Sequence, residues 1–228
     1  MFARNDRSPS IRAKIYGRAS ACCHADSSME LCVVVGGWTM ELFSYVMVLA
    51  SVIAGLAITQ LLQCVAGMVQ HPHQYKPYWV HVVWIAYAFE YIALWWWYEY
   101  NFAKTAQWSF ALYLFILVYA VVIYLMCAVL APLSLNKFAN FEAYYYSRRR
   151  WFLGLAALVI LFDVADTLSK GASYFASLGW HYSVGAIAFP ILYVIGMATR
   201  RRLYHGSIAV ISLVDHASQA FQNFSTIG

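Results

Sequence analysis

The chain has 228 residues, of which 63% are hydrophobic, 18% are aromatic and only 11% are charged. Soluble globular domains carry about a quarter charged residues, so this composition excludes a water-soluble globule and predicts a membrane protein. The net charge of +5 is explained by basic residues in the loops and in the N-terminal segment, which argues against nucleic-acid binding.

Residues 1–39 form a polar, basic segment that differs from the rest of the chain. The segment lacks the long apolar region and small-residue cleavage site of a signal peptide. We therefore expect it to be an artefact of an upstream start codon, with the natural chain beginning at Met40. The alternative is a tail on the cytoplasmic side, which would require an odd number of spans. Residues 40–228 are predicted to form a single transmembrane helical domain.

Long apolar windows predict an all-α membrane bundle of about six transmembrane helices with short loops. The windows cover residues 42–69, 78–98, 108–131, 151–168, 180–198 and 203–221. Polar residues dilute the last window, so an amphipathic helix at the membrane interface is its alternative. Basic and aromatic residues over 137–150 predict a short helix on the membrane surface before the fourth span.

Lysine and arginine residues divide unevenly between the predicted loops. The loops after helices 1, 3 and 5 hold Lys76, Lys137, Arg148, Arg149, Arg150, Arg200, Arg201 and Arg202, whereas the other two hold Lys104 and Lys170. The positive-inside rule then predicts an inner-membrane protein with the first set in the cytoplasm. The two arginine triplets are interpreted as lipid or topology anchors.

The same triplets open a shared pattern, RRRxxxGxxxxxxxxDxA, in the fourth and sixth predicted helices. Such similarity is one sign of duplicated halves in transporters. The alternative is that topology alone places arginine at cytoplasmic helix ends. In the first predicted helix, small residues offer two faces for close packing: Ala50, Ala54 and Ala57, or Ser51 and Gly55.

Acidic residues occur deep inside three of the predicted helices. Basic residues lie at the start of each of these helices. Glu90, Asp163 and Asp215 come about a dozen positions after them. At ~1.5 Å per residue, each lies roughly 18 Å into a hydrocarbon core about 30 Å thick. Asp166 shares a helix face with Asp163, and His216 adjoins Asp215.

An ionisable group at such depth is a functional-site hypothesis by default. We therefore expect these five residues to form a protonatable cluster that serves proton-coupled transport or cation passage, or that coordinates a divalent cation. The alternative is that the acids pair structurally or reach water at helix ends, since Glu90 precedes the interfacial aromatic stretch 95–98. The protein would then be a structural or partner-binding subunit. Either hypothesis is compatible with a homo-oligomer.

Two further functions remain open from the sequence. His81 and His205 lie at similar depth in two helices and could ligate a haem, although the main hypothesis expects no cofactor. The arginine triplets could hold lipid phosphates for an enzyme, but the chain contains no HExxH, GxSxG or glycine-rich phosphate loop. No catalytic residue is therefore assigned. Cys64 and Cys127 show no metal-binding spacing and are predicted to be packing residues.

Overall fold

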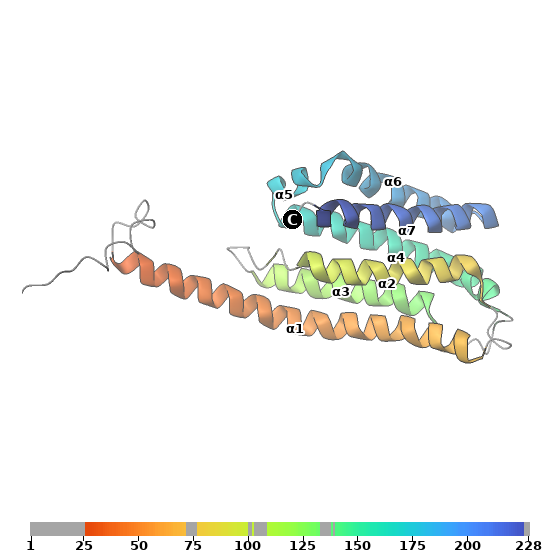
Figure 1. Ribbon diagram of the computed structural model, residues 1–228, viewed down its shortest axis with the longest axis horizontal. Helices are drawn as coiled ribbons and strands as arrows, with labels where there is room; N and C mark the ends of the chain where they lie inside the picture. Colours follow the sequence, from red (N-terminus) through yellow and green to blue (C-terminus); the bar gives the residue numbers. More distant parts are fainter. Residues whose placement is uncertain are drawn as a thin grey trace, which may run out of the picture.

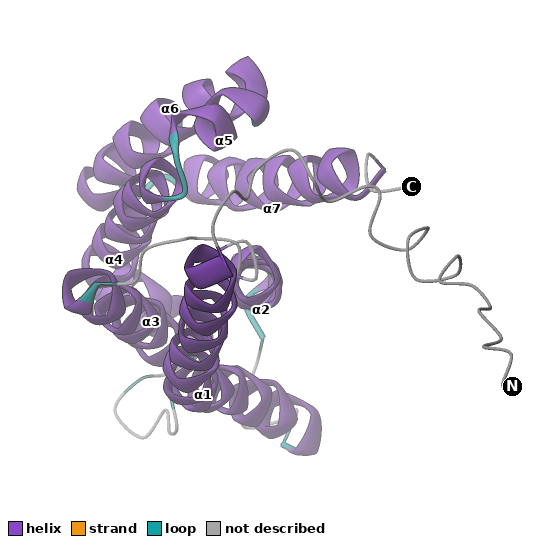
Figure 2. Cartoon of the chain, turned by 90° about the vertical axis from the view of Figure 1, so that its left-hand side faces the viewer, coloured by secondary structure: helices purple, strands orange, loops and turns teal. Residues whose placement is uncertain are grey.

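A computed structural model of the chain describes residues 26–71, 77–99, 102, 109–132, 138 and 140–225. These residues form seven helices: α1 (Asp26–Gln70), α2 (Trp79–Glu99), α3 (Phe110–Leu130), α4 (Phe141–Ser169), α5 (Ala172–Ser177), α6 (Gly179–Ala198) and α7 (Arg202–Ser225). The part of the chain that the structure describes contains helices and loops but no strand (Figure 2). The predicted all-α class is confirmed.

The long helices lie side by side, and α1 extends past the others at its N-terminal end (Figure 1). The main contacts join α1 to α3, α3 to α4, α4 to α6, and α2 to α7. Large aromatic side chains such as Trp84, Tyr119 and Phe152 are fully buried in the resulting core. α2 and α7 pack against each other, and together they lie opposite α4 and α6.

Four helices are long and apolar enough to cross a membrane: residues 43–70 of α1, and the whole of α3, α4 and α6. The structure therefore supports a multi-pass membrane protein. All six predicted helices are present, but α2 and α7 are not among these four: α2 is rich in Trp and Tyr, and α7 carries several polar residues. That α2 and α7 also cross the membrane stays a prediction.

The first helix runs without interruption from Asp26 through Met40. This continuity does not show where the natural chain begins, so the proposed start at Met40 stays a prediction. Residues 1–25 lie outside the described residues, as do Lys76, Lys104 and Lys137.

Small residues on α1 form part of the face that packs against the bundle. Ala50 and Ala57 are fully buried, whereas Gly55 on another face is exposed. The alanine face is thus the packing face, as close approach of helices requires. Cys64 and Cys127 are free and buried in the same apolar core, which confirms their prediction as packing residues.

The fourth helix begins earlier than its apolar window indicated. It starts at Phe141, where the side chain of Asn140 accepts a hydrogen bond from the backbone N–H of Ala143 at 2.9 Å and so caps the helix. The predicted separate surface helix is therefore wrong. Tyr144 and Tyr145 are buried inside the bundle rather than lying on a membrane surface.

The early start also bears on the duplication hypothesis. The first arginine triplet lies well inside α4, whereas the second spans the start of α7, which begins at Arg202. The two copies of the pattern therefore occupy different positions in their helices, which weakens the case for duplicated halves.

Candidate functional site

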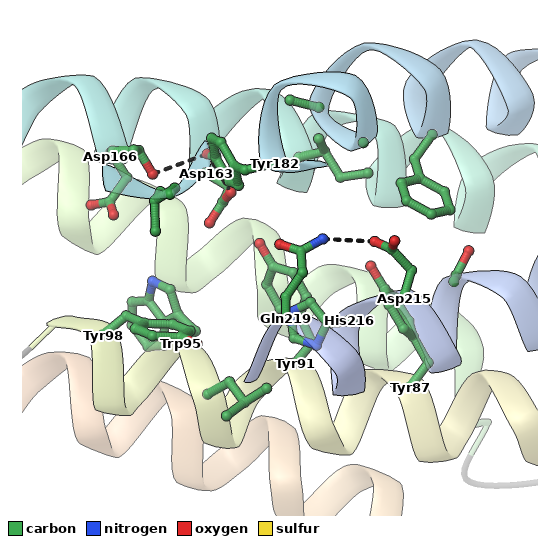
Figure 3. A pocket seen from close by; sticks show the side chains of 18 of the residues that line it. Tyr87, Tyr91, Trp95, Tyr98, Asp163, Asp166, Tyr182, Asp215, His216 and Gln219 are labelled. Carbon is green, nitrogen blue, oxygen red and sulfur yellow. Dashed lines mark hydrogen bonds between the residues drawn. The ribbon is translucent and has the colours of Figure 1, made fainter. Parts of the chain in front are cut away.

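A cavity of about 100 Å³ lies between α2, α4, α6 and α7 (Figure 3). One enclosed water needs about 10–15 Å³ on this measure, so the cavity has room for several water-sized groups. Its polar lining consists of Asp163, Asp166, Thr167, Lys170, Ser212, Asp215, His216 and Gln219. Four of the five predicted site residues therefore line one cavity.

The spacing of these residues explains why they face the same way. On α7, Ser212, Asp215, His216 and Gln219 follow one another at intervals of three, one and three residues. Residues three or four apart lie on one face of a helix. One face of α7, over about two turns, therefore presents all four to the cavity.

Asp163 is held by a hydrogen bond from another helix. The hydroxyl of Tyr182 on α6 donates to Asp163 Oδ2 at 2.8 Å and lies 3.0 Å from Thr167 Oγ1. Among the described residues, no basic side chain lies within 4.0 Å of the Asp163 carboxylate. Its partners in the structure are therefore neutral.

Asp215, like Asp163, is hydrogen-bonded to a neutral partner. Its Oδ2 accepts a hydrogen bond from Gln219 Nε2 at 2.7 Å, one turn along α7. In the described ranges, again no basic group comes within 4.0 Å of this carboxylate. Two half-buried carboxylates from different helices thus share one cavity without a paired cation.

Lys170 neutralises the third carboxylate. Its Nζ lies 2.5 Å from Asp166 Oδ2 and 4.0 Å from Glu99 Oε1, and all three side chains are at most 4% exposed. Burial lowers the pKa of Lys170, but the two carboxylates outweigh burial and raise this pKa above its usual value. Lys170 is therefore a cation committed to Asp166 and Glu99. The apolar windows of the sequence instead place both Lys170 and Glu99 in loops.

Glu90 is not part of the cavity wall. Its Oε2 lies 3.8 Å from Nδ1 of His216, whose ring stacks on Tyr91 with centroids 5.0 Å apart. His216 lines the cavity, and Glu90 contacts this imidazole without lining the cavity itself. Of the five residues in the predicted cluster, four therefore line the cavity, and Glu90 lies behind His216.

Aromatic rings form much of the wall, a feature that the sequence pattern did not indicate. On α2 the lining rings are Tyr87, Tyr91, Trp95 and Tyr98, at intervals of four, four and three residues. On α5 and α6 they are Tyr174, Tyr182, Phe189 and Tyr193. The stretch 95–98 is thus only partly a belt facing outward: Trp96 and Trp97 are 39% and 56% exposed, whereas Trp95 and Tyr98 face the cavity.

The arginine triplets make specific contacts between helix ends. Arg149, which is buried, donates from Nε to the Thr199 carbonyl at 3.2 Å, and Arg150 donates to the Met197 carbonyl at 3.4 Å. Carbonyls at a helix C-terminus lack partners within the helix and favour cations. Arg202 pairs with Glu142 at 2.7 Å. These arginines join α6 and α7 to α4, and their role as lipid anchors stays a prediction.

The two histidines of the haem hypothesis both contact the ring of Tyr145, with centroids 6.3 Å (His81) and 5.5 Å (His205) away. Nδ1 of His205 lies 3.0 Å from the Tyr145 hydroxyl, and its Nε2 lies 3.1 Å from the Thr199 carbonyl. Ligation of iron by His205 would break one of these contacts. An absorption spectrum of purified protein tests this hypothesis directly.

Comparison with models of protein families, with curated proteins and with solved structures found no match. The cavity must therefore be interpreted from its own residues. Within the described part of the chain, no three His, Cys, Asp or Glu side chains are arranged to hold a metal ion. What the arrangement offers is two carboxylates with neutral partners, several hydroxyls and an imidazole that can relay protons, and a wall of aromatic rings.

Proposed function

We propose that this chain is an inner-membrane transporter or channel that passes protons or cations through the cavity. The observation that carries the proposal is the meeting of Asp163 and Asp215, from different helices, in one cavity where their hydrogen-bond partners are neutral. An ionised carboxylate in a low dielectric is costly unless a proton or a cation neutralises it. The site is therefore suited to taking up and releasing positive charge.

Neighbouring groups support a proton path as well. The Tyr182 hydroxyl lies within hydrogen-bond distance of both Asp163 and Thr167, and the Glu90 carboxylate lies near the His216 imidazole. Carboxylate and imidazole side chains inside a membrane protein are typical of proton relays.

The contacts of the arginine triplets support the proposed sidedness. Arg149 and Arg150 of α4 bind carbonyls at the C-terminal end of α6, so the two triplets lie at the same end of the bundle. Basic residues collected at one end are typical of a cytoplasmic face.

Flux through reconstituted protein tests the proposal. Purified protein in liposomes is given a membrane potential, and proton entry is followed with an internal pH-sensitive dye. We expect Asp163→Asn and Asp215→Asn each to reduce the flux at least about tenfold, because each removes a group that binds the positive charge. Glu142→Gln is the matched control, since Glu142 pairs with Arg202 outside the cavity. Wild-type flux in both asparagine variants would contradict the proposal.

The second candidate is a structural or partner-binding subunit without transport. The hydrogen bond from Tyr182 on α6 to Asp163 on α4 favours it, because the bond joins two helices. In that case Asp163→Asn would lower the melting temperature or prevent assembly, and wild-type protein would show no flux above that of empty liposomes.

A further inference from the structure

We propose that the cavity is a binding site for a small organic ammonium ion, held between aromatic rings and the carboxylates of Asp163 and Asp215. This inference rests on the proposed function and specifies the class of cation. The charge of the lining, the chemistry of the wall and the volume of the cavity each support it.

The charge of the lining favours a cation over an anion or a neutral molecule. Asp163, Asp166 and Asp215 contribute three carboxylates, and Lys170 contributes one ammonium group. That ammonium is already shared by Asp166 and Glu99. A guest cation would supply the positive charge that Asp163 and Asp215 lack. Asp166 also keeps an acceptor free, because its buried Oδ1 accepts no hydrogen bond from the described residues.

The aromatic wall favours an organic cation over a metal ion. Cations lying within about 6 Å of a ring centroid are attracted by the ring, and aromatic cages recognise quaternary ammonium groups in this way. The rings lie on both sides of the cavity, on α2 and on α6. Metal ions instead need several oxygen or nitrogen ligands at once, and the described His, Cys, Asp and Glu residues show no such grouping.

The molecule already holds one ammonium group in this manner. Nζ of Lys170 lies 4.7 Å from the centroid of the Phe102 ring and 5.9 Å from that of Tyr174. Tyr174 also lines the cavity. One part of the cavity wall therefore combines carboxylates with aromatic rings around an ammonium group, which is the chemistry that we assign to the guest.

Small residues of α6 form the part of the cavity wall next to Asp215. Gly185 and Ala186 of α6 line the cavity, and a Cβ atom added at Gly185 would contact the Phe189 ring at 3.5 Å and Asp215 Oδ2 at 3.8 Å, so a larger side chain here would reach into the cavity. The cavity volume of about 100 Å³ admits a group several times the size of one water. An ammonium ion with a few methyl groups fits this space.

Calorimetric titration of the purified full-length protein in lipid nanodiscs tests the inference, with tetramethylammonium as the probe and sodium and potassium as comparisons at equal ionic strength. We expect saturable binding of tetramethylammonium that is at least about tenfold tighter than that of either metal ion. The double variant Asp163→Asn with Asp215→Asn should weaken this binding at least about tenfold, since two charge-assisted contacts are lost.

A pair of substitutions at one position isolates the aromatic contribution. Tyr182→Phe and Tyr182→Leu both remove the hydrogen bond to Asp163, but only the leucine variant also removes the ring. We expect tetramethylammonium to bind the leucine variant about fivefold to thirtyfold more weakly than the phenylalanine variant. Trp96→Leu is the control, because Trp96 lies outside the cavity wall and should bind as wild type.

The outcomes separate this inference from the proposed function. Equal affinities of the two Tyr182 variants, or sodium binding as tight as that of tetramethylammonium, would overturn the ammonium site. Proton flux without tetramethylammonium binding would overturn this inference and leave the proposed function intact. Tetramethylammonium binding without any flux would support the site and overturn transport. The Tyr182 pair keeps the test decisive if the double asparagine variant does not fold.

Discussion

Lys170 is the residue on which the charge balance of the cavity depends most directly. It faces two buried carboxylates, Asp166 and Glu99, and has almost no contact with solvent. A buried ion pair loses far more when one partner is removed than the pair contributes in total, because an uncompensated charge is left behind. Replacing Lys170 should therefore affect stability strongly.

We expect Lys170→Met to destabilise the protein by about 3–5 kcal/mol. Thermal unfolding of the purified protein, followed by intrinsic fluorescence, measures this loss as a lower melting temperature. Lys170→Arg should retain most of the stability, and adding Asp166→Asn to Lys170→Met should restore part of it. An unchanged melting temperature for Lys170→Met would show that the carboxylates do not need this cation.

Some of these charged residues can be predicted from the sequence, whereas others cannot, for a physical reason. Asp163 and Asp215 could be predicted because a lone acid in an apolar window is conspicuous. Lys170 and Glu99 lie just beyond or at the ends of two helices, so their burial depends on how the ends of α2 and α4 meet. No local pattern encodes that contact.

Between elements, α7 packs tightly against α2 at Gly206. A Cβ atom added at Gly206 would overlap the ring of Trp79 at the start of α2, whereas one added at Gly55 on α1 would have nothing within 4 Å. The two glycines therefore allow the cost of overpacking to be separated from the general gain in helix propensity that alanine brings.

We expect Gly206→Ala to lower the stability by about 1–3 kcal/mol, because Trp79 or the α7 backbone must shift. Gly55→Ala should leave stability unchanged or raise it by up to about 1 kcal/mol. Melting temperatures of the two variants in the same detergent provide the comparison. A rise of equal size in both would contradict the close contact between α2 and α7.

The helices themselves are largely predictable from the sequence, and two of the differences have local causes. The start of α4 was placed too late because the stretch from Phe141 to Arg150 is aromatic and basic and so resembles an interfacial segment. The short helix α5 was missed because it is too brief for any periodicity. The sequence does mark its two ends with glycine. Gly171 and Gly179 adopt φ angles of +117° and +76°, which glycine tolerates best.

At the scale of the whole molecule, the cavity exists because four helices turn their polar or aromatic faces to one another. The sequence contains each of these faces as a regular spacing, for example Ser212, Asp215, His216 and Gln219 on α7. It does not show which faces meet, because that depends on the packing of α2 on α7 and of α4 on α6. The proposed function depends on this meeting more than on any single acid.

Thiol labelling of the cavity tests the central claim most directly. Gly185→Cys places a thiol beside Asp215, and Ile187→Cys places one on the outward face of the same helix, each in a background without the native cysteines. We predict that a membrane-impermeant, quaternary-ammonium thiosulfonate modifies the thiol at position 185 at least about tenfold faster than a sulfonate analogue does, and faster than it modifies position 187. No labelling at position 185, or equal rates for the cationic and anionic reagents, would contradict a water-accessible cavity that selects positive charge.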